Sequence, residues 1–367
     1  ALSHAYRAVN WNRHKKVYDL VLVGAVALYL VGFVGVSSAV WSGERAVSPM
    51  TMLIRALGSG GLVLLHVILC IGPLSRFFPS AAAPLLYNRR HLGVTMFVLG
   101  FLHAALATLW YHGFGATNPL VSIFTSNGNY GDWVGYPGAF PFEPLGFVAL
   151  VILFLMAATS HDFWLKNLSP RVWKALHMLV YVAYGLLILH VALGAMQTRG
   201  SGATAVLLGA GVLVVGGLHA AAGWREWRRD RRAAAGDGPW VEVGGVDAIG
   251  EGCASVVRLR GRERVALVRH GGRVSAVSNV CAHQGGPLGE GAVVDGCLTC
   301  PWHGYQYTPE NGQSPPPFTE KIPTYRVKIE GSRVYVNPEA LPAGTSVEPA
   351  VVPGDDAPPP DVQEQPV

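Results

Sequence analysis

The chain has 367 residues, of which half are hydrophobic and only 14% are charged, and its formal net charge is +5. This composition is too apolar for an ordinary soluble protein, and the length leaves room for two or three domains. The positive charge does not indicate nucleic-acid binding, because the basic residues stand at the ends of apolar runs, where membrane topology explains them. The cysteine count of five is odd, which argues against a disulfide framework and favours a metal site.

Several apolar stretches are long enough to cross a bilayer, which takes about 20 residues in a helix. Six spans are predicted, at residues 19–41, 51–73, 91–112, 144–163, 173–195 and 203–223. The first is longer than the apolar part of a typical signal peptide, so we interpret it as a membrane helix. We therefore expect a multi-domain membrane protein that begins with a short cytoplasmic segment, 1–18, and a six-helix transmembrane bundle, 19–223.

Lysine and arginine are distributed unequally between the two ends of these helices. One side has fifteen: Arg7, Arg13, Lys15, Lys16, Arg76, Arg89, Arg90, Lys166, Arg171, Lys174, Arg225, Arg228, Arg229, Arg231 and Arg232. The other side has Arg45 and Arg199, with Arg55 just inside the second helix. Because short cytoplasmic loops are enriched in Lys and Arg, we expect both termini and the soluble part to be cytoplasmic, at a bacterial-type inner membrane.

Four histidines within the apolar stretches form two levels. The third helix carries His91 and His103, and the fifth carries His177 and His190. The second histidine of each helix follows the first by 12 or 13 residues, which is about 18–20 Å along a helix. Ionisable groups in a membrane are costly and usually functional, and neutral imidazole is a common axial ligand of haem. Two pairs at matching depths predict two stacked b-type haems.

The residues around these histidines resemble a known family. The segments RRHLG at 89–93, LH at 102–103, WKALH at 173–177 and LHV at 189–191 are similar to the ferric reductase-like transmembrane superfamily, which includes ferric reductases and NADPH oxidases. The resemblance covers about residues 50–220. It implies b-type haems held by pairs of histidines, and electron flow from the cytoplasm to the outside.

One spacing departs from that family. Its oxidase members commonly place the first ligand of the third helix further from the second, at the position that Arg89 occupies here. A spacing of 12 residues turns His91 about 120° away from His103 around the helix axis. The fourth ligand is therefore open, with His91 ranked first, His219 second and His66 third. A single haem on the deeper pair, or a second haem with a non-histidine or open position, also remains open.

The sequence changes character after residue 223. Residues 224–239 are a basic helix end and linker, and residues 240–337 are short β-rich runs separated by Gly-rich turns. This pattern predicts a small antiparallel β domain. Residues 338–367 are rich in Pro, Asp and Glu and poor in aromatic residues, so we expect a disordered tail there.

Two motifs in this domain combine thiolates with imidazoles. They are Cys281-Ala-His283 and Cys300-Pro-Trp-His303. A Rieske [2Fe–2S] centre has two Cys on one iron and two His on the other, and a structural zinc site is the alternative use of such a set. The segments CAHQGGPL and CPWHGYQY resemble Rieske domains, which implies these four residues as cluster ligands. Cys297 also forms a C-x2-C with Cys300, but we interpret it as a strand residue.

The type of Rieske domain follows from four positions. Quinol-oxidising members have an extra Cys in each loop, where this chain has Gly286 and Trp302, and often a Ser where it has Tyr305. Tyr307 remains as a hydrogen-bond donor for a cysteine sulfur. Because fewer donors stabilise the reduced cluster less, we expect a potential toward the low end of the roughly −150 to +300 mV Rieske range. This resembles the ferredoxin and dioxygenase type.

Two functions are compatible with this sequence. The first is a transmembrane oxidoreductase relay, in which a cytoplasmic donor such as a reductase or ferredoxin supplies the cluster, and an acceptor outside receives the electrons. The second is a non-enzymatic anchor and electron-carrying subunit of a larger respiratory or photosynthetic complex. Residues 240–337 contain no Gly-rich dinucleotide-binding fingerprint, so a separate donor is expected. The sequence does not decide between enzyme and subunit.

Overall fold

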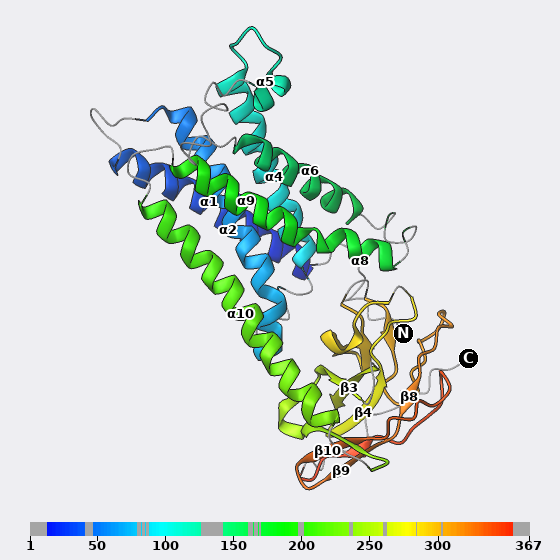
Figure 1. Ribbon diagram of the computed structural model, residues 1–367. Helices are drawn as coiled ribbons and strands as arrows, with labels where there is room; N and C mark the ends of the chain where they lie inside the picture. The colour runs from blue at the N-terminus through cyan, green and yellow to red at the C-terminus, as the bar shows by residue number, and fades with distance from the viewer. Residues whose placement is uncertain are drawn as a thin grey trace. The chain divides into compact units, whose positions relative to one another are not determined.

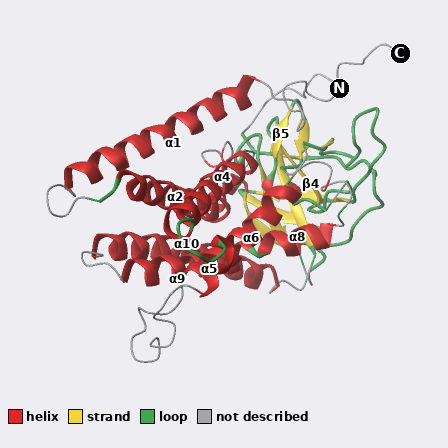
Figure 2. Cartoon of the chain, turned by 90° about the horizontal axis from the view of Figure 1, so that it is seen from above, coloured by secondary structure: helices red, strands yellow, loops and turns green. Residues whose placement is uncertain are grey.

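The computed structural model describes residues 13–40, 47–78, 82, 85, 88–125, 142–160, 164, 168, 170–196, 202–234, 238–259, 263–283, 285–301 and 304–354. The chain divides into two compact units. One consists of Arg13–Gly72 and Asn88–Leu218, and the other contains His219–Val367 together with Pro73–Tyr87 and the N-terminal residues. The first unit consists of helices, and all the described strands belong to the second (Figures 1 and 2).

The helical elements follow the predicted spans closely. They are α1 Arg13–Val40, α2 Pro49–Phe77, α4 Arg89–Ala107, the π-helical turn η3 Thr108–His112, α5 Pro119–Thr125, α6 Glu143–Thr159, α8 Pro170–Met178, α9 Val180–Met196 and α10 Gly202–Ala234. Five helices in the described part of the chain are long and apolar enough to cross a membrane, and α6 is a shorter apolar helix. The predicted helical membrane part is confirmed, and the chain is a multi-pass membrane protein.

Two of the predicted helices are irregular. The fifth span is interrupted at Leu179, between α8 and α9. The third ends in the π-helical turn η3 instead of regular α-helix. Such turns are rare and occur frequently at functional sites. Both irregularities lie next to histidines, at His177 and His112.

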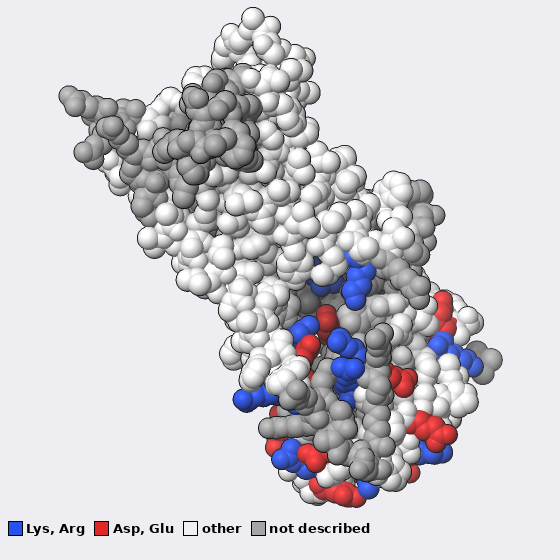
Figure 3. All heavy atoms as spheres, viewed as in Figure 1, with Lys and Arg blue, Asp and Glu red and all other residues white. Residues whose placement is uncertain are grey.

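The helical unit has a small core and a wide apolar surface. Its buried cluster includes Leu65, Ala149 and Ala183, which have no exposed surface. Many outward side chains of α1 and α10, such as Leu28 and Leu213, are three-quarters exposed and apolar, as a lipid environment favours. On the face seen in Figure 3, the described surface of the apolar helices is almost free of charged side chains, whereas the strand-containing unit carries both signs.

The second unit is antiparallel β, as predicted. Its strands are β1 Val241–Gly245, β2 Ala254–Arg258, β3 Arg264–His270, β4 Arg273–Ser278, β5 Ala292–Val294, β6 Cys297–Thr299, β7 Gln306–Tyr307, β8 Thr324–Tyr325, β9 Val327–Glu330, β10 Arg333–Val336 and β11 Ala350–Val351. Three sheets have the orders β1-β10-β9, β11-β4-β3-β2 with β8 on β4, and β5-β6-β7.

Strand β3 separates two hydrophobic cores. Because side chains alternate between the faces of a strand, Val265 and Leu267 enter one core, while Ala266 and Val268 enter the other. The second core lies under the short sheet β5-β6-β7 and includes the cysteine Cys300. This arrangement explains why four consecutive residues of β3 are all buried.

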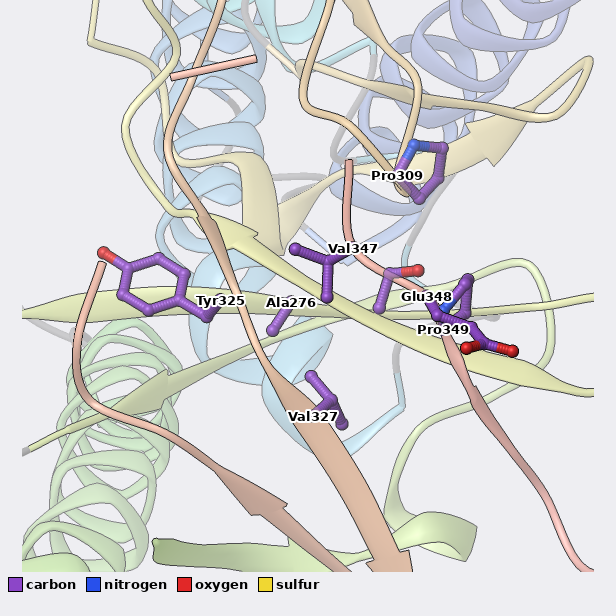
Figure 4. A pocket seen from close by; sticks show the side chains of 8 residues that line it. Ala276, Pro309, Tyr325, Val327, Val347, Glu348 and Pro349 are labelled. Atoms are coloured by element: carbon purple, nitrogen blue, oxygen red, sulfur yellow. The ribbon is translucent and has the colours of Figure 1, made fainter. Parts of the chain in front are cut away.

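The predicted disordered tail is partly wrong. Residues 338–354 are ordered: β11 pairs with the edge of β4, and the backbone N–H of Val347 donates to the carbonyl of Glu310. Val352 is buried in the first core. In Figure 4 Val347 lies beside Ala276 of β4. A few apolar residues in a Pro-rich, acidic segment are enough to hold it, because they cover an open sheet edge. Residues 355–367 lie outside the described part.

Candidate redox centres

Two histidines from different helices meet in the helical unit. His103 on α4 and His190 on α9 have ring centroids 6.3 Å apart, with ring planes at 83°. A metal-to-imidazole bond is about 2 Å long, and the centre of a five-membered ring lies about 1.1 Å from its atoms at ordinary bond lengths. Two imidazoles on opposite sides of one iron therefore have centroids about 6 Å apart. The observed separation fits this geometry.

The other ring nitrogen of each histidine is held by a neighbouring helix. Nδ1 of His103 donates to the carbonyl of Ile54 on α2 at 2.8 Å, and Nδ1 of His190 donates to the carbonyl of Phe142 at 2.8 Å. Histidines that bind metals almost always donate their second N–H in this way, which fixes the tautomer and the ring orientation. Nε2 of both side chains is thereby left as the nitrogen for iron.

Glycines make these contacts sterically feasible. A Cβ atom at Gly58 of α2 would lie 2.7 Å from Nδ1 of His103, and one at Gly146 of α6 would lie 2.7 Å from Nδ1 of His190. Real Cβ atoms do not approach so closely, so each imidazole needs a glycine opposite it. Sequence reasoning missed Gly58 and Gly146, because apolar helices contain many other glycines.

The shallower pair of histidines is arranged differently. Nδ1 of His91 lies 2.5 Å from a carboxylate oxygen of Asp19 on α1. Nδ1 of His177 donates to the carbonyl of Trp173 at 2.9 Å, and its Nε2 lies 3.3 Å from the hydroxyl of Ser160. The rings of His91 and His177 do not meet in the structure. Nδ1 is the nitrogen held in both residues, as in the deeper pair, whereas Nε2 of His177 already has the hydroxyl of Ser160 as a partner.

The two alternative ligands have different surroundings. His66 on α2 donates through Nδ1 to the carbonyl of Leu62, and its ring meets Tyr184 edge-on at 5.4 Å. Its Nε2 lies so close to Gly211 of α10 that a Cβ atom added at Gly211 would overlap with the imidazole ring. An iron ion would need that same space, which disfavours His66 as a ligand. His219 lies half-buried on α10.

Two loops of the β domain share one backbone geometry. The carbonyl of Cys281 accepts from the N–H of Gly285, and the carbonyl of Cys300 accepts from the N–H of Gly304. Both glycines have left-handed backbones, with φ of 71° and 69°, which suit glycine above all other residues. Each cysteine N–H also donates to the carbonyl five residues later. The loops therefore present the two cysteines in equivalent ways.

The cysteines have the surroundings that cluster ligands require. Cys281 and Cys300 are both buried, and both belong to the second core. The hydroxyl of Tyr307 accepts from the N–H of Ala282 and lies 3.3 Å from Sγ of Cys281. Burial and the nearby thiolate raise the pKa of Tyr307, so this hydroxyl keeps its proton and can donate it to sulfur. The expected donor to a cysteine is therefore present.

His283, between these cysteines in sequence, is covered by an aromatic ring. The rings of His283 and Tyr305 stack at 4.7 Å with an angle of 8°. Burial, and a hydrogen bond to Glu320, raise the pKa of Tyr305. His303 lies outside the described residues, and within the described part no group of three or more metal-binding side chains is assembled. The four-ligand assignment of this loop pair therefore stays a prediction.

The remaining cysteines are not arranged as ligands. Cys297 lies in β6, the strand that leads to Cys300, and burial raises the pKa of its thiol. Burial also raises the pKa of the Cys253 thiol. Cys70 lies in α2 and is half-buried. All three are free in the structure, in line with ordinary packing roles.

Comparison with known proteins identifies both parts. A family described as ferric reductase like transmembrane component matches residues 57–188, and a family described as Rieske [2Fe-2S] domain matches residues 239–326. The heme-binding subunit MsrQ of protein-methionine-sulfoxide reductase from Bordetella pertussis is 31% identical over 166 residues, which are 44% of this chain and 72% of that protein. The chain belongs to the ferric reductase-like transmembrane family and carries a Rieske domain.

The Rieske domain has its own relatives. The ferredoxin component of the alkene monooxygenase system from Xanthobacter autotrophicus is 36% identical over 104 residues, which are 28% of this chain and 84% of that protein. Among solved structures, the ferredoxin of carbazole 1,9a-dioxygenase from Nocardioides aromaticivorans is 26% identical and matches 27% of this chain and 98% of its own, with a TM-score of 0.26. His103 lies within the residues that the ferric reductase-like family matches, His190 lies two residues beyond them, and both cysteine loops lie within the Rieske match.

Proposed function

We propose that this protein carries electrons across the membrane between a Rieske [2Fe–2S] cluster and b-type haem. His103 and His190 would hold one haem, and their 6.3 Å ring separation is the observation that supports this most directly. The heme-binding function that the name of MsrQ states is consistent with it. The bound groups supply one-electron redox chemistry, while the chain orients both imidazoles through Ile54 and Phe142.

A second haem on His91 and His177 is part of this proposal. The carboxylate of Asp19 holds Nδ1 of His91, which is the partner that a metal-binding histidine commonly has. This contact favours His91 as the fourth ligand, whereas Gly211 occupies the space beside Nε2 of His66.

The cluster ligands in the proposal are Cys281 and Cys300 on one iron and His283 and His303 on the other. Their support is the paired loop geometry, the burial of both sulfurs and the match to the Rieske family. A zinc site would use the same residue types, so metal analysis must decide between them.

The proposed sidedness rests on charge, and the proposed direction of electron flow rests on the resemblance to the ferric reductase-like family. Fifteen Lys and Arg residues on one side of the predicted spans favour a cytoplasmic Rieske domain and cytoplasmic termini. The deeper pair, His103 and His190, then serves the outer side. A cytoplasmic reductase or ferredoxin supplies electrons, and an acceptor outside receives them.

Quantification of cofactors in the purified full-length chain tests this function. We expect a b-type absorbance spectrum, a Rieske EPR signal, and iron with acid-labile sulfide in cluster stoichiometry. Cys300→Ser should abolish the EPR signal, whereas the matched change Cys297→Ser, three residues earlier, should retain it. His190→Ala should abolish the outer haem. Zinc in place of iron, or an unchanged haem content in His190→Ala, would refute the proposal.

The alternative is a subunit without an activity of its own. Purification from native membranes discriminates, because a subunit comigrates with stoichiometric partners. Reduction of a ferric chelate or of oxygen by the isolated chain with a chemical donor would support an enzyme.

A further inference from the structure

A hydrogen-bonded acid–base group lies at the same end of the helical unit as the deeper histidine pair. His112, the last residue of the π-helical turn η3, has Nδ1 2.8 Å from the hydroxyl of Ser122 on α5. Its Nε2 lies 3.5 Å from a carboxylate oxygen of Glu143, the first residue of α6. The side chain of His112 is 11% exposed and that of Glu143 is 27% exposed, so the group is sheltered but reaches the surface.

This group is linked to a proposed haem ligand through one peptide. The residue before Glu143 is Phe142, whose carbonyl accepts the hydrogen bond from Nδ1 of His190. The ring of Phe142 also lies 5.3 Å from the His190 ring and packs where a Cβ on Gly194 would lie. The carboxylate of Glu143 is therefore fixed beside the peptide that orients His190.

The hydrogen bonds of His112 suit a change of protonation state. A hydroxyl can either donate or accept, and it rotates to suit its partner. When His112 is neutral, Ser122 can donate to Nδ1 while Nε2–H faces Glu143. When His112 is protonated, both ring nitrogens donate, and Ser122 becomes an acceptor. The proton can thus arrive or leave while every polar atom of the group keeps a hydrogen-bond partner. A buried polar atom without a partner would cost about 1–3 kcal/mol.

We propose that His112 and Glu143 form a redox-linked proton site for the outer haem, a proposal that rests on the function given above. An electron added to the iron on His103 and His190 lowers the local charge by one. Uptake of one proton by the His112–Glu143 pair from the outer side restores it, because nearby charges act strongly in a medium of low dielectric constant. Each electron delivered to this end is accompanied by one proton.

Few other titratable groups face the pair in the described part of the molecule. Helix α5 contains none, and α4 and α9 contribute His103 and His190, which the proposal assigns to iron. Tyr111 of η3 donates its hydroxyl to Thr51. Arg55 is the charged residue of α2 at this end. None of these offers a second carboxylate–imidazole pair.

The proposal narrows the class of acceptor. A ferric chelate gains an electron without a proton, whereas a quinone or an oxo compound gains two electrons with two protons, forming a quinol or releasing water. A proton site beside the outer haem suits the second class, because two one-electron deliveries bring two electrons and two protons. The acceptor proposed here is a small molecule that takes up protons when it is reduced.

Spectroelectrochemical titration of the full-length haem protein at several pH values tests the inference. In the unaltered chain we expect the midpoint potential of the outer haem to fall as pH rises. Glu143→Gln and His112→Gln should each reduce that slope by at least half, while the absorbance and low-spin EPR signals of the haem persist. Glu226→Gln, which removes a carboxylate paired with Arg76 in the other unit, is the matched control and should keep the slope.

The outcomes separate this inference from the proposed function. A flat pH dependence in the unaltered chain, or an unchanged slope in both variants, overturns the proton site while the haem remains. Absence of a haem on His190 overturns the proposed function instead. If Glu143→Gln fails to fold, His112→Gln and Ser122→Ala carry the test, since Ser122→Ala keeps both titratable groups and should shift the pH range of the slope. An unshifted range in Ser122→Ala with an unchanged slope in His112→Gln also overturns it.

Discussion

The hydroxyl of Tyr307 lies 3.3 Å from the sulfur of Cys281, one of the proposed cluster ligands. A donor to sulfur stabilises the reduced, more negative cluster. Tyr307→Phe should therefore lower the midpoint potential by roughly 65–130 mV, the equivalent of a hydrogen bond to a charged group in a one-electron couple. EPR-monitored redox titration measures this. Tyr335→Phe on β10 is the control, and an equal shift in both variants would contradict the role of Tyr307.

Asp19 gives the proposed inner haem a testable feature. A carboxylate on Nδ1 makes the imidazole of His91 a stronger donor to iron, which stabilises the ferric state. Asp19→Asn should raise the midpoint potential of that haem by roughly 60 mV, a tenfold shift of a one-electron equilibrium. Redox titration of the b-type bands checks the shift. Asp247→Asn, exposed on the β domain, should change nothing. If Asp19→Asn leaves every haem unchanged, His91 is not a ligand.

Single residues show how far sequence reasoning reached. The spacing of His103 and His190 from the basic helix starts placed both at one depth, and the structure brings their rings together. Their hydrogen-bond partners could not be predicted, because Ile54 and Phe142 contribute main-chain carbonyls that any residue type offers. Asp19 was missed because a lone acid near a helix start is usually part of a solvated end.

Among the elements, the packing of helices against the histidines depends on two glycines. Gly58→Ala and Gly146→Ala place a Cβ 2.7 Å from an imidazole nitrogen, so each should displace a ligand and lower the haem content by at least half. Gly185→Ala in α9 is a matched control, since its Cβ would meet nothing within 4 Å. Haem quantification in detergent-purified protein measures the effect. Equal loss in all three variants would mean that the helices, not the contacts, are disturbed.

The strand β11 is an element that the amino-acid composition did not predict. Val352, next to it, is 7% exposed and lies in the first core, whereas Val351 is 59% exposed. Val352→Ala should destabilise the Rieske domain by roughly 1–2 kcal/mol, since it removes buried methyl groups and leaves a cavity. Val351→Ala should have little effect. Loss of the Rieske EPR signal on heating checks both, and equal midpoints would show that the segment contributes no stability.

This element also shows the limit of composition. Residues 338–354 were expected to be disordered because the whole segment 338–367 is rich in Pro, Asp and Glu. An average over the segment does not show which sheet edge needs a partner strand. The membrane helices and the β-rich runs were predicted well, because their hydrophobic periods extend over many residues. The break at Leu179 was not, since its flanking residues are as apolar as the rest of the span.

For the whole molecule, the proposal fixes an order of reduction. In vesicles with the Rieske domain outermost, a membrane-impermeant reductant should reduce the cluster first and the haem afterwards. In vesicles of opposite orientation the same reductant should act slowly on the cluster. Stopped-flow absorbance with freeze-quench EPR follows both centres. Immediate haem reduction in both orientations would contradict the proposed sidedness. His190→Ala should leave cluster reduction unchanged.

The hydrogen bonds on the deeper histidine pair have a consequence for biogenesis. Each imidazole donates a hydrogen bond to a carbonyl that comes earlier in the chain, that of Ile54 for His103 and that of Phe142 for His190. Both haem ligands are available only after residue 190 has left the ribosome and α9 has entered the bilayer. Haem binding would then be a late step of assembly that joins α4 to α9 through their histidines. It would also stabilise the packing of α2, whose Ile54 carbonyl accepts the hydrogen bond of His103. Cells starved of haem should accumulate inserted but loosely joined helices, open to membrane proteases.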